Sequence, residues 1–213
     1  MGTTGLTDFR RLSNRYILLR PGQTSYDAAE RIDSNPINKL DVARGLTERG
    51  RAAVGEAARE LARRGVEDPI VWYDSGARAA QTAEIVGEVL LVPRTRLVPE
   101  YSFLSARGLG VLDRGNASLV IPLVHEADAL DSAYAPDEAD DGTPSDSIDD
   151  VFVRVRQAVS KIETQYSGET VILVGDSDVL STIAAAACGT DLRLHSRCAS
   201  LLNADGRRGA IYP

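Results

Sequence analysis

VILVGDSDVLST, residues 171–182, is the stretch that decides the fold. Its first four residues, 171–174, form a short apolar and β-branched run, which predicts a buried strand. Gly175 ends that run, and the small residues that follow predict a helix over 177–187 that ends at Gly189. A buried strand that leads directly into a helix is the repeating unit of a parallel α/β sheet.

The same alternation of strand and helix continues outward from this stretch. Apolar runs predict buried strands at 16–20 and 70–73 and a short strand near 96–98. Helical spacing of apolar residues, with Thr47 and Asp146 or Ser147 as caps, predicts three more helices, at about 48–64, 77–90 and 148–165. We therefore predict one three-layer α/β/α domain with a mainly parallel sheet, in which the strands 16–20, 70–73 and 171–174 are central neighbours.

Three segments lack this regular alternation. Residues 1–13 are expected to be an N-terminal extension of a domain over 14–213. Residues 101–147 combine Gly, Pro and acidic clusters, which predicts a loop-rich acidic insertion. The tail SLLNADGRRGAIY, residues 200–212, predicts a hairpin.

The composition excludes several classes of protein. The chain has 213 residues, of which 43% are hydrophobic and 26% charged, so it can bury a core and is not disordered throughout. A net charge of -7 argues against a nucleic-acid partner. No apolar run approaches the roughly 18 residues of a membrane span. Cys188 and Cys198 form no CxxC pattern, so we expect reduced thiols, no cofactor and no metal.

Much of the negative charge lies in one segment. Residues 126–150 hold acidic side chains but no Lys or Arg. Such a segment is either a solvated loop or a surface that meets a basic protein partner or a cation.

The topology rule for parallel sheets selects a candidate site. Ligands bind where the strands end at their carboxyl termini. That edge of the predicted sheet carries Arg20–Gln23, Asp74–Arg78, Glu100 and Gly175–Asp178.

Motifs at this edge follow one another in a familiar order. They are LLRPGQT at 18–24, LTERG at 46–50, SGARAAQTA at 75–83, VPEYSF at 98–103 and VILVGDSDVL at 171–180. Together they resemble the histidine phosphatase superfamily, the phosphoglycerate mutase-like group, over about residues 14–213. Within this group, the sequence most resembles the plant and algal branch. That resemblance implies an intracellular protein of the plastid or cytoplasm.

The resemblance implies roles for individual residues. In the family, a histidine in the first signature attacks the phosphoryl group, and a second histidine steadies it during transfer. Arginines hold the phosphate oxygens, and an acid moves the proton. Here Arg20 and Arg78 match phosphate-holding arginines, Arg31 matches a further one, and Glu100 matches the acid.

Both histidine positions depart from the family pattern. Pro21 stands where the nucleophile is expected, and its ring nitrogen can neither attack phosphorus nor carry a proton. Asp176 stands at the second position, where its negative charge would repel a phosphoryl group. These changes predict a pseudoenzyme that acts by binding, as a sensor of a phosphorylated small molecule or anion or as a scaffold subunit. The alternative is an active phosphatase or phosphomutase with an atypical mechanism.

Other interpretations of the same residues remain open. Arg20 and Arg78 either keep an anion site or form salt bridges with nearby aspartates. His125 and His195 are the only histidines, and we expect neither to replace the nucleophile. The pattern Asp176-x-Asp178 also resembles the aspartyl-phosphate loop of haloacid dehalogenase-type phosphatases. That loop needs a lysine downstream, whereas both lysines of this chain lie upstream.

Overall fold

A five-stranded sheet forms the centre of the computed structural model, which describes residues 9, 11–201 and 210–211. The strand order is β3-β2-β4-β1-β5. The strands are β1 (Arg15–Leu19), β2 (Ile70–Asp74), β3 (Leu97–Glu100), β4 (Thr170–Val174) and β5 (Ala210–Ile211). All neighbours pair in parallel except β5, which is antiparallel to β1.

The predicted centre of the sheet is confirmed. Strand β4 lies between β1 and β2, with Val174 in register with both Leu19 and Tyr73. Because these strands are parallel and aligned, the loops that follow them meet at one edge of the sheet. The fourth parallel strand, β3, is the one predicted near residues 96–98.

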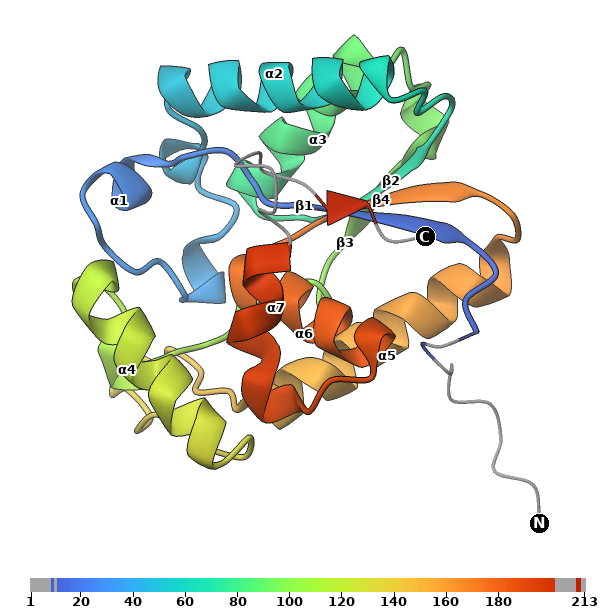
Figure 1. Ribbon diagram of the computed structural model, residues 1–213. Helices are drawn as coiled ribbons and strands as arrows, with labels where there is room; N and C mark the ends of the chain where they lie inside the picture. The colour runs from blue at the N-terminus through green and yellow to red at the C-terminus, as the bar shows by residue number, and fades with distance from the viewer. Residues whose placement is uncertain (1–8, 10, 202–209, 212–213) are drawn as a thin grey trace.

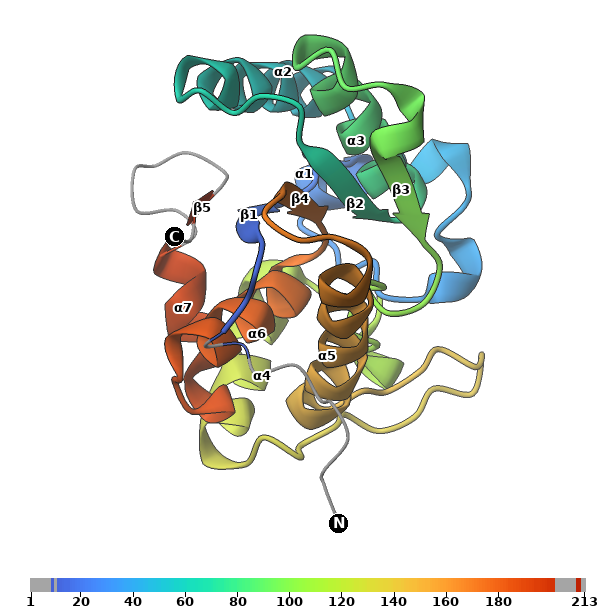
Figure 2. The same cartoon turned by 90° about the vertical axis from the view of Figure 1, so that its right-hand side faces the viewer.

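Helices cover both faces of the sheet, as Figures 1 and 2 show from two directions. On one face lie α2 (Glu48–Arg63) and α3 (Ala77–Val89), and on the other lie α5 (Ile148–Gln165), α6 (Ser177–Cys188) and α7 (His195–Leu201). Two separate hydrophobic clusters fill the spaces between these layers. The three-layer α/β/α prediction is therefore confirmed.

Local sequence explains where the long helices begin and end. Ser147 caps α5, and its side chain and that of Asp150 form a capping box. The side chain of Thr47 caps α2 by accepting from the Gly50 N–H. Gly189 ends α6 in the left-handed conformation, with a φ of 67°.

The structure adds detail to the less regular parts of the prediction. The insertion also contains a helix, α4 (Ala117–Leu130), which Asn116 caps. Helix α7 extends to Leu201, the second residue of the segment predicted as a hairpin, and most of that segment lies outside the described residues. On α5, Val153 is apolar but 56% exposed, so it does not belong to the buried face of that helix.

The short helix α1 (Ser25–Ala28) and several turns of 3-10 helix complete the connections. Most of the predicted extension 1–13 lies outside the described residues, although Phe9 is buried and packs near Phe152. Within the described residues, every helix is too short or too polar to cross a bilayer.

Candidate functional site

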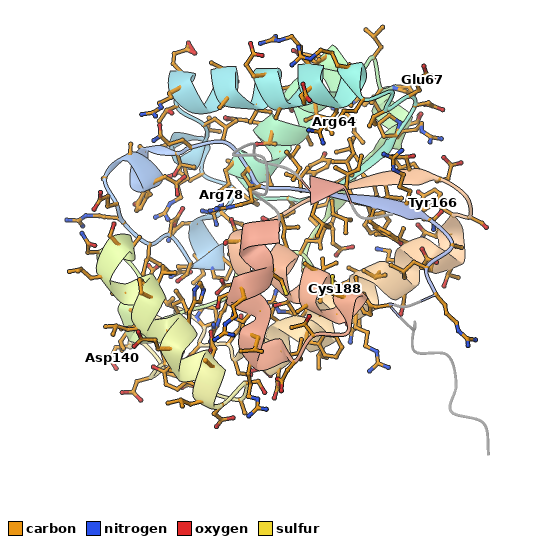
Figure 3. All side chains as sticks on the ribbon, viewed as in Figure 1. Arg64, Glu67, Arg78, Asp140, Tyr166 and Cys188 are labelled. Atoms are coloured by element: carbon orange, nitrogen blue, oxygen red, sulfur yellow. The ribbon has the colours of Figure 1, made fainter. Side chains whose placement is uncertain are left out.

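A cleft of about 210 Å³ lies at the edge where the central strands end. Figure 3 places Arg78 there, beyond the ends of β1 and β4. Four basic and four acidic residues line the cleft, together with small and apolar residues of the insertion. The charged residues are Arg20, Arg31, Arg78, Arg107, Asp27, Asp33, Asp176 and Asp178.

Arg78 does not stand free in this cleft. Its Nη2 donates to Asp176 Oδ2 at 2.5 Å and to the Asp33 carbonyl oxygen at 3.3 Å. The two paired side chains are 19% and 25% exposed, so the pair lies at the cleft surface. The carboxylate of Asp176 thus occupies a place where an anionic ligand would meet Arg78.

The charges around the pair act in opposite directions. Burial raises the pKa of Asp176 and Arg78 lowers it, while Asp74 and Asp27 raise it further and Arg20 lowers it. Burial lowers the pKa of Arg78, but the attraction of Asp176 and Asp33 outweighs this, so the guanidinium remains charged. The pair is therefore surrounded by more negative charge than Arg78 alone can balance.

Arg20 and Arg31 line the same cleft without such a partner. Within the part of the chain that the structure describes, neither side chain forms a hydrogen bond or an ion pair. Arg20 is half-buried at the end of β1, and Arg31 is exposed. These two guanidinium groups are therefore available to an anion.

Pro21 and Glu100 lie at the same edge but are not among the residues that line the cleft. Pro21 lies two residues after the end of β1, and the next residue, Gly22, donates its N–H to Thr82 Oγ1 at 3.2 Å. Glu100 ends β3, is 4% exposed and accepts from Lys161 Nζ at 3.1 Å. Burial raises the pKa of Glu100, but backbone N–H groups and Lys161 outweigh this and lower it, which favours the carboxylate over a proton donor.

Another aspartate at this edge, Asp74, is also paired with a basic side chain. Asp74 Oδ1, at the end of β2, accepts from Lys39 Nζ at 3.0 Å. The same ammonium donates to the Tyr101 carbonyl oxygen and to Ser105 Oγ, both at 2.8 Å. Lys39 thereby fastens the loop before α2 to the sheet edge, an ion pair that the sequence did not suggest.

Beside the cleft lies a buried network that sequence reasoning missed. Arg107 forms two hydrogen bonds with the Asp128 carboxylate, at 2.7 and 2.9 Å, and its Nη1 lies 3.5 Å from Asp178 Oδ2. The side chains of Arg107 and Asp128 are 2% and 0% exposed. Burial raises the pKa of both Asp128 and Asp178, but their charged and hydrogen-bonded neighbours outweigh this and lower it.

The two histidines of the chain meet in this network. His125 Nε2 lies 3.1 Å from Asp178 Oδ1, and His195 Nε2 lies 3.2 Å from Asp128 Oδ2. Their rings contact edge to face, with centroids 5.2 Å apart. His195 Nδ1 lies 2.8 Å from Ser181 Oγ, so the buried ring has a polar partner at each nitrogen. This agrees with the structural role expected for His195.

The cluster also has the composition of a metal site. His125, Asp128 and His195 offer ligand atoms within 4.8 Å of one another. However, both oxygens of Asp128 already accept from Arg107, so a metal ion would have to displace a buried guanidinium. The residues fit an internal ion-pair network better than a metal centre.

Only one signal in the sequence could have revealed this network. His125 and Asp128 are three residues apart, which places both on one face of α4 once that segment is known to be helical. Arg107 lies in a segment without secondary structure, where no pattern marks its partner.

Comparison with known proteins agrees with the fold and the order of motifs. The chain belongs to the histidine phosphatase superfamily (branch 1), whose family model matches residues 16–206. It is 30% identical over 211 residues to the bifunctional protein Rv2228c of Mycobacterium tuberculosis, covering 92% of this chain and 51% of that protein. The uncharacterized protein Mb2253c of Mycobacterium bovis matches equally. The chain thus spans about half the length of these curated relatives.

Solved structures share the architecture. The mycobacterial glucosyl-3-phosphoglycerate phosphatase Rv2419c superimposes with a TM-score of 0.65 and 24% identity, covering 88% of this chain and 84% of that one. YhfR of Bacillus stearothermophilus gives a TM-score of 0.63 and 26% identity, covering 85% and 83%.

Proposed function

We propose that this chain is a catalytically degenerate histidine phosphatase-like protein that acts by binding. Its ligand would be a phosphorylated small molecule or another anion, held in the cleft by Arg20, Arg31 and Arg78. One observation carries the proposal: Arg78 is paired with Asp176, the residue at the second histidine position, while proline occupies the first.

The loss of catalysis follows from the chemistry of Pro21. Phosphoryl transfer in this family needs a nitrogen nucleophile at that position, and the proline nitrogen is part of a peptide bond. Glu100, the residue matched to the acid, is an ion-paired carboxylate that does not line the cleft. Neither a nucleophile nor a proton donor is therefore available at the family positions.

Anion binding survives the loss of catalysis because it requires only hydrogen-bond donors with positive charge, and neither a nucleophile nor a proton donor. Arg20 and Arg31 can each offer a planar pair of N–H donors to phosphate oxygens. Arg78 joins them only after its bond to Asp176 opens, which opposes binding. We therefore expect weak affinity for inorganic phosphate, about millimolar, that falls as salt is added.

The scaffold part of the proposal rests on the acidic segment 126–150, which would receive a protein partner. Nucleic acid is not a proposed partner, because it would be repelled by the same charge. An intracellular location, in the plastid or cytoplasm, rests on the resemblance alone.

Two measurements test the proposal. Purified protein should hydrolyse an aryl phosphate no faster than buffer and should form no phosphohistidine with labelled phosphate donors. Calorimetric titration with inorganic phosphate at low salt should detect binding that Arg20→Ala weakens. Hydrolysis that Arg78→Ala abolishes would overturn the proposal, and so would the absence of any phosphate binding.

A second candidate is the atypical phosphatase. His125 is the observation that favours it, because this histidine is bonded to Asp178, which lines the cleft. An imidazole and a carboxylate in contact can act as a general base. Hydrolysis that is lost in His125→Gln and kept in His195→Gln would support this candidate over the binding protein.

A further inference from the structure

Helix α4 exposes a row of leucines on the side that faces away from the protein. Leu119, Leu123 and Leu130 are 69%, 64% and 84% exposed. At about 100° per residue, these positions lie within about 40° of one another around the helix axis, so they form one stripe. We call these three residues the outer stripe. Figure 1 shows α4 at the edge of the molecule.

The opposite face of α4 is the one that the fold uses. Val124 and Asp128 are buried there, and His125 on the same side contacts Asp178. The inner side also packs Val120 and Ile121 against Ile32 and Leu109, so α4 buries apolar residues there and still exposes leucines on its other side. Packing within this chain explains the inner residues but gives no reason for the outer stripe.

Exposed leucines on one face indicate a surface that is covered part of the time. Single exposed apolar residues are common, but a contiguous apolar patch on a surface helix marks an interaction site. Leu91, 87% exposed just after α3, is an example of the isolated kind. The outer stripe differs from it because three leucines share one face.

The charges around the outer stripe define its partner. Glu126 is exposed and lies within the stripe by helical position, and Asp131 is exposed directly after Leu130. Both belong to the segment 126–150, which contains no Lys or Arg. Pairing of two copies through this face would bring these carboxylates together, so self-association is disfavoured and a basic partner is favoured.

We propose that the outer stripe binds a basic amphipathic helix of a partner protein. The apolar residues of that helix would pack against the three leucines, while its lysines or arginines would meet Glu126 and Asp131. This refines the partner surface proposed above and is independent of the cleft, because it needs neither Arg20, Arg31 nor Arg78.

A designed peptide pair tests the proposal. The probe is a fluorescent 18-residue helix with leucines along one face and lysines elsewhere, and the control is a scrambled peptide of identical composition. Fluorescence anisotropy should show binding of the amphipathic peptide and at least tenfold weaker binding of the scrambled one. Leu123→Ser should raise Kd about tenfold and Leu119→Ser/Leu123→Ser about a hundredfold, since each change removes a buried leucine contact.

Leu91→Ser is the matched control, because it removes an exposed leucine away from α4 without a change of charge. It should leave Kd unchanged. Equal weakening by Leu91→Ser would show that the effect is not specific to the outer stripe, and equal binding of the scrambled peptide would reduce it to charge; either result would overturn the proposal. Sedimentation equilibrium tests whether a second copy of this chain binds the outer stripe instead. A dimer that Leu123→Ser dissociates would assign the surface to that second copy and overturn the proposal of a basic partner. Loss of phosphate binding in the cleft would leave all these outcomes unaffected, so the two proposals fail separately.

Discussion

Two arginine–aspartate pairs lie within the same edge of this molecule, and they differ in almost every property. Arg107 and Asp128 are almost completely buried and are joined by two hydrogen bonds. Arg78 and Asp176 keep about a fifth of their side chains exposed and are joined by one hydrogen bond of 2.5 Å. The first pair lies within the insertion and joins its irregular segment to α4, whereas the second lies at the surface of the cleft.

The difference teaches that a charge pair cannot be interpreted from residue types alone. Arg107 also donates to the carbonyl oxygens of Asp146 and Tyr134, so every part of its guanidinium has a protein acceptor. Arg78 has one backbone acceptor and one carboxylate, with the cleft beside them. In the structural pair, all guanidinium nitrogens have acceptors within the protein. In the pair that can exchange partners, some N–H groups of the arginine lack such an acceptor among the described residues.

The largest expected effect comes from breaking the buried pair. Arg107→Met removes both guanidinium hydrogen bonds of the buried Asp128 and leaves His195 as its remaining partner, which should lower the free energy of unfolding by about 3–5 kcal/mol. Urea denaturation followed by circular dichroism measures this. Arg107→Met/Asp128→Leu is the control, and it should recover much of the loss because the buried carboxylate of Asp128 is removed together with its arginine. A loss below about 1 kcal/mol in the single variant would mean that the pair is not structural.

A smaller but functional effect should follow from opening the cleft pair. Asp176→His removes the competing carboxylate and should tighten phosphate binding about tenfold with little change in stability. Calorimetry at low salt measures the affinity. Asp176→Glu keeps the charge and serves as the control. Equal affinity in Asp176→His and the unaltered protein would show that this carboxylate does not compete with the ligand.

Restoring the nucleophile extends the same test. Pro21→His combined with Asp176→His should give trace phosphatase activity, whereas either single variant should give none. Turnover in Asp176→His alone would contradict the assignment of Pro21 to the nucleophile position.

The buried network should also be sensitive to alkali. Burial lowers the pKa of His125, but the hydrogen bond to Asp178 outweighs this and raises it above its ordinary value of 6.5. The stabilisation is thus complete below about pH 6.5 and is lost as the pH rises through the higher pKa of the folded state. The free energy of unfolding should fall between pH 6 and 9, and less so in His125→Gln.

Other groups around His125 set the acid side of this profile. Asp128 and Asp178 have lowered pKa values in the folded protein. Their contribution to the free energy of unfolding is therefore present above pH 3.8, their ordinary pKa, and is lost as the pH falls through the lowered pKa values. Arg107 stays charged throughout. An identical alkaline slope in His125→Gln and the unaltered protein would show that His125 does not cause it.

The smallest effect is expected at a third ion pair, Glu100 with Lys161. Lys161 is 46% exposed, so Lys161→Ala should lower stability by no more than about 1 kcal/mol. Glu100→Gln should leave phosphate affinity unchanged, because this side chain does not line the cleft. A clear change of affinity in Glu100→Gln would bring this residue back into the site.

The sequence predicted those parts of the fold that depend on local periodicity. Strands such as 171–174 are apolar throughout, and α5 has a strong cap at Ser147, so both were located correctly. Helix α4 was missed because its leucines face outward and its inner face carries charge, which removes the periodic signal. The family motifs placed Arg20, Arg31, Arg78 and Asp176, which line one cleft. They could not place Arg107, whose partner Asp128 lies in the helix α4 that was not predicted.

The position of β1 between β4 and β5 has a consequence for the ribosome-bound chain. Asn14 accepts a hydrogen bond from the Glu169 N–H, across a separation of 155 residues. At about 5–20 residues per second, the first strand is synthesised roughly 8 to 30 s before this partner appears. Strands β2 and β3, with α3 between them, can pair during that interval. We therefore expect β2 and β3 to pair before β1 does, and the nascent β1 to remain unpaired until β4, which begins at Thr170, has been synthesised.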